Sequence, residues 1–187
     1  MEVSRIRVLR GPNLWSRNTV IEAIVACSGD EASLKRIPEF EVRLRHRFPA
    51  ISMLQATVQE EAISVAHALE YAALGLQAEA GCPVTFSRTA QTVEPGVYQV
   101  VAEYSEEAVG RLAFDLAVTL CRSALDDTPF DLAEALCRLR DLDEDIRLGP
   151  STGSIVQAAA LRGIPYRRLT DGSLVQFGWG SRQRRIQ

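Results

Sequence analysis

Apolar and polar positions alternate along much of the chain in the manner of β-strands. Residues 3–10 place valine and isoleucine between arginines, the pattern of a strand with one buried face. Residues 19–27 are β-branched and apolar at both ends, which favours a second strand. Residues 84–104 contain two strand patterns separated by a turn at residues 94–96. The pattern predicts a mostly antiparallel sheet of about four strands.

Four other segments carry apolar residues at helical spacing. They are residues 38–48, 59–80, 106–125 and 131–147. Pro38 suits a helix start, Gly81 a C-terminal cap, and Ser105 the N-cap of the third helix. Because strands and helices do not alternate regularly, the sequence favours an α+β fold rather than a doubly wound parallel sheet.

Gly149 and Pro150 mark the most credible boundary in the chain. The segment before it, residues 1–148, carries the sheet and the long helices and is expected to form one domain. The segment after it, residues 149–187, predicts a partial α/β element. Its expected parts are a helix over residues 155–162 capped by Ser151 or Thr152, and strands at 166–169 and 173–177. Such a short segment encloses too little core to fold alone.

Composition and charge narrow the class of protein. The chain has 187 residues, a net charge of −3 and 47% hydrophobic residues, enough for an ordinary core. Charges interrupt every long apolar stretch, and the N-terminus lacks the apolar core of a signal peptide. These features predict a soluble, cytosolic protein that neither enters membranes nor, being net acidic, binds nucleic acid.

The cysteines and the basic residues exclude two kinds of site. Four cysteines lie far apart without a CxxC pair, which favours buried, reduced thiols over a zinc ribbon. Lys35 is the only lysine, so the Gly-Lys pair of a phosphate-binding P-loop is missing. Every other basic residue except histidine is arginine, which either reflects genomic base composition or suits binding to carboxylates.

Two surface segments are candidate ligand-binding sites. The motif RGPNLWS, residues 10–16, places Arg10, Asn13 and Trp15 around a Gly-Pro turn. Arg10 would bind a carboxylate and Trp15 would stack on a guanidinium. In the alternative interpretation, Asn13 closes the turn and Trp15 covers the core edge. Arg88 lies on a predicted strand and, beside Arg10, would make a basic platform.

The helix expected over residues 59–80 carries a third candidate site. His67, Glu70 and Tyr71 occupy positions i, i+3 and i+4, so they share one helix face. A histidine and a glutamate on one helix face could bind a metal ion or move a proton. His46 is the only other histidine. The alternative is a buried helix with a hydrogen-bonded histidine and tyrosine.

Four ordered motifs together resemble the N-terminal region of cyanophycin synthetases. They are RGPNLWS, PVTFSRT with PGVYQVVAEY, LGPSTGSIV, and QFGWGSRQRRIQ. The resemblance implies that the partner of this chain is cyanophycin, a poly-aspartate polymer bearing an arginine on each side-chain carboxylate. It also implies ATP-grasp and Mur-ligase-like modules downstream that use ATP and magnesium, and residues 149–187 resemble the start of the first. No cofactor is expected in this chain, which lacks the ligase sites and alone would not catalyse ligation.

The resemblance leads to three hypotheses. The first is a module that binds polymer or primer through Arg10, Asn13, Trp15 and Arg88. The second is a metal-dependent hydrolase that trims cyanophycin into primers, because many relatives carry an HxxEH-like helix where this chain has His67 and Glu70. In that motif, two histidines one turn apart bind one zinc ion beside a glutamate that moves a proton. Tyr71 takes the place of the second histidine, which weakens that hypothesis and with it a zinc ion on His67. The third is a structural module that sets a homo-oligomer and seats the ATP-grasp module.

Overall fold

A four-stranded antiparallel sheet organises the first part of the molecule. In the computed structural model, which describes residues 1–51 and 63–187, the strand order is β1-β2-β4-β3. The strands are β1 (Glu2–Leu9), β2 (Val20–Ala26), β3 (Ser87–Gln91) and β4 (Val97–Glu103). Every neighbouring pair is antiparallel. The predicted sheet is therefore confirmed, including the hairpin between β3 and β4.

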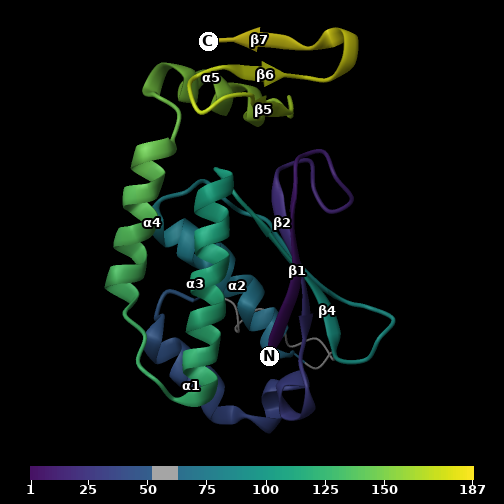
Figure 1. Cartoon of the computed structure of the whole chain (residues 1–187), viewed down its shortest axis with the longest axis vertical. Helices are drawn as coiled ribbons and strands as arrows, with labels where there is room; N and C mark the ends of the chain where they lie inside the picture. Colours follow the sequence, from purple (N-terminus) through teal and green to yellow (C-terminus); the bar gives the residue numbers. More distant parts are fainter. Residues whose placement is uncertain (52–62) are drawn as a thin grey trace.

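The long helices all lie on one side of this sheet (Figure 1). They are α1 (Pro38–Arg47), α2 (Val65–Ala80), α3 (Glu107–Asp126) and α4 (Leu132–Ile146). Short 3₁₀ turns, η1 (Gly29–Ala32) and η2 (Leu34–Arg36), lead from β2 into α1. Of these helices, α2 packs against β3 and β4, and α4 packs against α2 and α3.

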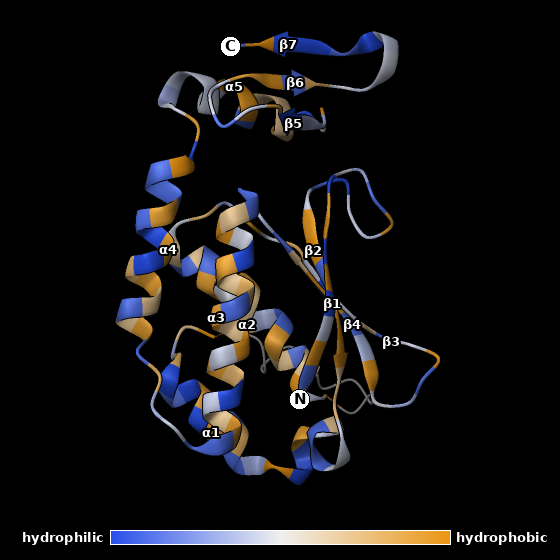
Figure 2. Cartoon of the chain, in the orientation of Figure 1, coloured by the Kyte–Doolittle hydropathy of each residue, from blue (hydrophilic) through white to orange (hydrophobic). Residues whose placement is uncertain are grey.

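The hydrophobic core lies between the sheet and the helices. Ile21 and Val25 of β2, and Val100 of β4, point into it, and each is at most 1% exposed. From the helix side, Leu69 and Phe114 fill the space with similar burial. Figure 2 shows α2 and α3 carrying hydrophobic residues between sheet and solvent, as amphipathic covering helices do. The predicted α+β class is confirmed.

The C-terminal lobe, residues 149–187, is small and polar by comparison with the N-terminal lobe, residues 1–148. It contains α5 (Pro150–Leu161) and a three-stranded antiparallel sheet in the order β5-β6-β7. The strands are β5 (Tyr166–Arg168), β6 (Val175–Phe177) and β7 (Arg184–Ile186), with a 3₁₀ turn, η4 (Gly180–Arg182), before the last. Two predicted strands are confirmed, and β7 was missed because most of it is hydrophilic (Figure 2).

The structure corrects several local predictions. Helix α2 begins at Val65, after the N-cap Ser64, rather than at residue 59; residues 59–62 lie outside the described part. The N-cap of α3 is Glu106, not Ser105. Helix α5 begins at Pro150, because a proline needs no N–H bond in the first turn.

The cysteines and the helix lengths give two further findings. Cys27, Cys82 and Cys121 are buried free thiols, as predicted, but Cys137 is exposed because it lies on the outer face of α4. Among the described residues, no helix is long and apolar enough to cross a membrane.

Candidate functional site

One asparagine braces the loop between β1 and β2, residues 10–19. The Nδ2 of Asn13 donates to the carbonyl oxygen of Asn18 at 2.9 Å. Its Oδ1 accepts from the backbone N–H groups of Trp15 and Ser16, at 2.9 and 3.0 Å. These three hydrogen bonds use most of what the amide offers. Asn13 is therefore a positioning residue of the loop, as the alternative interpretation of the sequence held.

A hydrogen bond also fixes the side chain of Trp15. Its indole N–H donates to Glu22 at 2.9 Å, and the second oxygen of that carboxylate accepts from Arg7. Glu22 lies on the sheet face away from the helices, and its side chain is 2% exposed. A carboxylate so buried needs both partners to offset its desolvation. Trp15, Glu22 and Arg7 together hold the 10–19 loop against the open face of the sheet, the face that points away from the helices.

Arg10 points toward the helices rather than toward this open face. Its guanidinium lies 3.6 Å from the carboxylate of Glu107 in the first turn of α3. Arg111, one turn later, contacts the other oxygen of Glu107 at 3.0 Å. These three side chains and Asn13 line a shallow groove of about 480 Å³. The groove presents one carboxylate between two guanidinium groups.

Arg88 stands at the opposite edge of the sheet from Arg10. It is exposed on β3, opposite Val101 of β4, in the cross-strand row that contains Glu22 and Arg7. Because β1 and β3 are the two edge strands, β2 and β4 separate the two arginines. The structure does not bring Arg10 and Arg88 together, and the single basic platform expected from the sequence is not formed.

His67 and Glu70 both face the sheet from α2. The Nδ1 of His67 accepts a hydrogen bond from the N–H of Ser64 at 3.2 Å and lies 2.9 Å from the Ser64 hydroxyl, and the ring packs edge-on against Tyr98. Glu70 is 5% exposed and accepts from the hydroxyl of Ser87 at 2.7 Å.

The environment of Glu70 changes its acidity. Burial raises the pKa of this carboxyl, and the Ser87 hydrogen bond and the charge of Arg88 offset part of that rise. A carboxyl with a raised pKa holds its proton to a higher pH than an ordinary glutamate does.

Metal binding was the other role expected of this helix. A catalytic zinc site uses three protein ligands and one open position. Among residues 1–51 and 63–187, no three His, Cys, Asp or Glu side chains converge as such a set would. Tyr71 stands where a second histidine would lie, and Nδ1 of His67 is already engaged at the helix cap. The described residues thus do not fit a metal site, and no chemistry is assigned to one.

Sequence reasoning missed two parts of this arrangement. Glu22 is the only charge in a run of apolar and β-branched residues, a signal that a buried, paired carboxylate stands on the strand. The pairing of Arg10 with Glu107 and Arg111 joins residues almost 100 positions apart, and no local pattern shows it.

Fold and site together define a small α+β module with a braced surface loop and a mixed arginine and glutamate groove. A family model described as the cyanophycin synthase-like N-terminal domain matches residues 25–126, more than half of the chain. The chain therefore belongs to the cyanophycin synthase-like N-terminal domain family.

Several cyanophycin synthetases are similar in sequence to this chain along its whole length. The cyanophycin synthetase of Trichormus variabilis is 36% identical over 202 residues, covering 100% of this chain and 22% of that protein. Those of Geminocystis herdmanii and Synechocystis sp. are also 36% identical, over 205 and 203 residues, each covering 100% of this chain and 23% of the relative. The chain thus spans less than a quarter of the length of the relatives it matches.

Proposed function

We propose that this chain binds the cyanophycin polymer, or a primer of it, and holds it for bond-making performed elsewhere in a longer protein. The observation that carries the proposal is the groove in which Glu107 lies between Arg10 and Arg111. An arginyl-poly-aspartate chain offers a carboxylate and a guanidinium in every repeat. The two arginines match the carboxylate, and Glu107 matches the guanidinium.

The energies of the existing ion pairs support exchange with a ligand. The side chains of Arg10, Glu107 and Arg111 are 59%, 38% and 50% exposed. Ion pairs exposed to this degree contribute about 0–1 kcal/mol, so an incoming carboxylate displaces them at little cost. The braced loop also keeps Arg10 close to its bound position, which reduces the entropy lost on binding.

The other residues predicted to bind polymer take different parts in this proposal. Asn13 and Trp15 position the loop, since their polar groups are used inside the molecule. Arg88 would contact only a polymer long enough to cross the open face of the sheet. Binding of long but not short segments that depends on Arg88 would indicate such a path.

Titration of the purified chain with cyanophycin segments at low and high salt tests the proposal. Saturable binding that weakens with salt is expected, because the contacts are between exposed charges. The double substitution Arg10→Gln and Arg111→Gln should weaken binding by roughly ten-fold or more. Arg122→Gln, an exposed arginine elsewhere on α3, serves as the control. Absence of binding at low salt, or equal affinity of the double variant, would reject the proposal.

A second candidate function rests on α2. Glu70 combines burial, a raised pKa and a position one turn from His67, which favours acid–base chemistry on a polymer bond. Incubation of cyanophycin with the chain, with and without added zinc, tests this hydrolase. Cleavage that Glu70→Gln abolishes would support it, whereas intact polymer under both conditions would exclude it.

The length of the relatives motivates the rest of the proposal. Since this chain covers 22–23% of cyanophycin synthetases, we propose that it acts beside ATP-grasp and Mur-ligase-like modules that use ATP and magnesium, in a homo-oligomer that it helps to assemble. The reading frame downstream of the codon for Gln187 is the direct test.

A further inference from the structure

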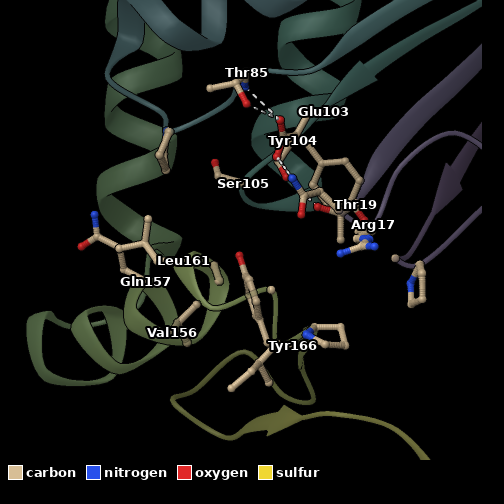
Figure 3. Close-up of a pocket in the computed structure, with 18 of the residues that line it drawn as sticks. Arg17, Thr19, Thr85, Glu103, Tyr104, Ser105, Val156, Gln157, Leu161 and Tyr166 are labelled. Atoms are coloured by element: carbon tan, nitrogen blue, oxygen red, sulfur yellow. Dashed lines mark hydrogen bonds between the residues drawn. The ribbon is translucent and has the colours of Figure 1, made fainter.

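A large cleft separates the two lobes and is distinct from the groove at Arg10. Its volume is about 910 Å³, within the range of sites that enclose small molecules. The 10–19 loop and the segments around Thr85 and Ser105 form one wall, and α5 with residues 163–166 forms the other. Figure 3 shows Tyr166 rising from the C-terminal lobe into this space. Both lobes therefore contribute side chains to the same cavity.

Three polar side chains that line the cleft have no strong hydrogen-bond partner among the described residues. They are the exposed guanidinium of Arg17, the hydroxyl of Ser105 and the hydroxyl of Tyr166. The Ser105 oxygen is fully shielded from solvent, and the group that interacts with it is the Cys82 thiol, a weak hydrogen-bonding group. A buried hydroxyl held only by a thiol gains free energy from a stronger partner. A bound ligand with acceptor atoms would satisfy all three.

The cleft lining carries one positive and one negative side chain, Arg17 and Glu103. Glu103 also lines it, but its carboxylate already accepts from Asn18 at 2.8 Å and from the N–H groups of Thr85 and Phe86 at 2.9 and 2.8 Å. Arg17 is left without a counterion among the residues that line the cleft. One cation in the same cleft as two hydroxyl donors suits a carboxylate, whereas phosphate sites generally gather more positive charge.

The opposite wall of the cleft is partly aliphatic. Leu161 and Ile164 line it and are 83% and 40% exposed, whereas Val156 beside them is already buried. Exposed branched side chains facing a cavity gain free energy when an apolar group covers them. We propose that the cleft binds a small carboxylate with an aliphatic body, the carboxylate at Arg17, Ser105 and Tyr166 and the body against α5. This site goes beyond the polymer groove and does not depend on it.

NMR titration of the 187-residue chain tests this assignment. The probe is 4-methylpentanoate, and its neutral amide of the same shape is the matched control. A second arm uses N-acetylleucine, in which the same carboxylate stands at the end of a peptide-like body. Saturable shifts are expected at the backbone amides of Ser105 and Leu161, with the amide probe at least ten-fold weaker because it lacks the charge. Whichever acid binds more tightly identifies the source of the carboxylate.

Substitutions locate the carboxylate. Arg17→Gln should weaken acid binding by roughly ten-fold or more, and Ser105→Ala or Tyr166→Phe by roughly two- to ten-fold each. Arg122→Gln, outside the cleft, should leave it unchanged. Absence of saturable shifts with both acids, equal binding of acid and amide, or unchanged binding in Arg17→Gln would overturn the proposal. Each result leaves the polymer titration at Arg10 and Arg111 to be judged separately.

Discussion

The two lobes differ in how they are held together. In the N-terminal lobe, a continuous cluster of buried apolar residues joins the sheet to the four helices. In the C-terminal lobe, the only buried apolar residues are Val156 and Val175, whereas Ile155 and Leu161 of α5 are 50% and 83% exposed. Because burial of apolar area dominates folding free energy, the first lobe has the means to fold alone and the second has not.

A few polar contacts attach the second lobe to the first. Arg168 pairs with Glu106 at 3.2 Å and donates to the carbonyl oxygen of Ile146, while its other N–H groups bind carbonyls of its own hairpin. One arginine thus fixes the strands of the small lobe to the end of α4 and the start of α3. Apolar packing stabilises the N-terminal lobe, whereas hydrogen bonds from a charged side chain position the C-terminal lobe.

The largest expected effect comes from the core of the N-terminal lobe. Phe114 of α3 is 1% exposed, and Phe114→Ala should lower the free energy of unfolding by about 3–5 kcal/mol. Val175→Ala, in the other lobe, should leave the main urea transition in place and lower only the hydrogen-exchange protection of β6. If both substitutions shift the main transition equally, the lobes unfold as one unit.

A glycine-to-alanine pair gives the next largest contrast. A Cβ on Gly110 of α3 would lie 2.4 Å from the Cβ of Tyr104, whereas on Gly153 of α5 it would meet nothing closer than 3.5 Å. Gly110→Ala should therefore destabilise the protein by about 1–2 kcal/mol, overpacking exceeding the gain in helix propensity. Gly153→Ala should strengthen its helix by about 0.5–1 kcal/mol. Urea denaturation measures the first, and hydrogen exchange of α5 the second.

The elements of both lobes could be predicted from local sequence, but the contacts within the site could not. Periodicity located the strands and most helices, because side chains such as Phe40 and Leu44 recur at the spacing that the fold buries. The exact ends of the helices depend on their capping residues. The N-cap of α3 is Glu106, one residue after the predicted Ser105. The hydrogen bond between Trp15 and Glu22 and the ion pair between Arg10 and Glu107 depend on strand register and helix placement. No local sequence pattern encodes either of these.

The junction between the lobes provides the third prediction. Arg168→Gln removes the guanidinium that bridges Glu106 and Ile146. Hydrogen-exchange protection of β5 and β6 should fall by roughly ten-fold, since a hydrogen bond to a charged group contributes about 1.5–3 kcal/mol. The exposed neighbour Arg167 has no ion pair in the described chain, so Arg167→Gln is the control. Equal effects of the two substitutions would show that Arg168 does not hold the lobe.

The smallest effect concerns Glu70, a buried carboxyl of the N-terminal lobe. Burial raises the pKa of Glu70, so the folded chain holds this proton to higher pH than the unfolded chain does. The stability that this provides is fully present at low pH and is lost as pH rises through the folded pKa. Glu70→Gln has no proton to lose, so its Tm relative to the parent chain should rise as pH increases above the ordinary pKa of a glutamate, about 4.3. Glu94→Gln, in the exposed β3–β4 turn, should show no such trend, and a relative Tm of Glu70→Gln that falls with pH would contradict the assignment.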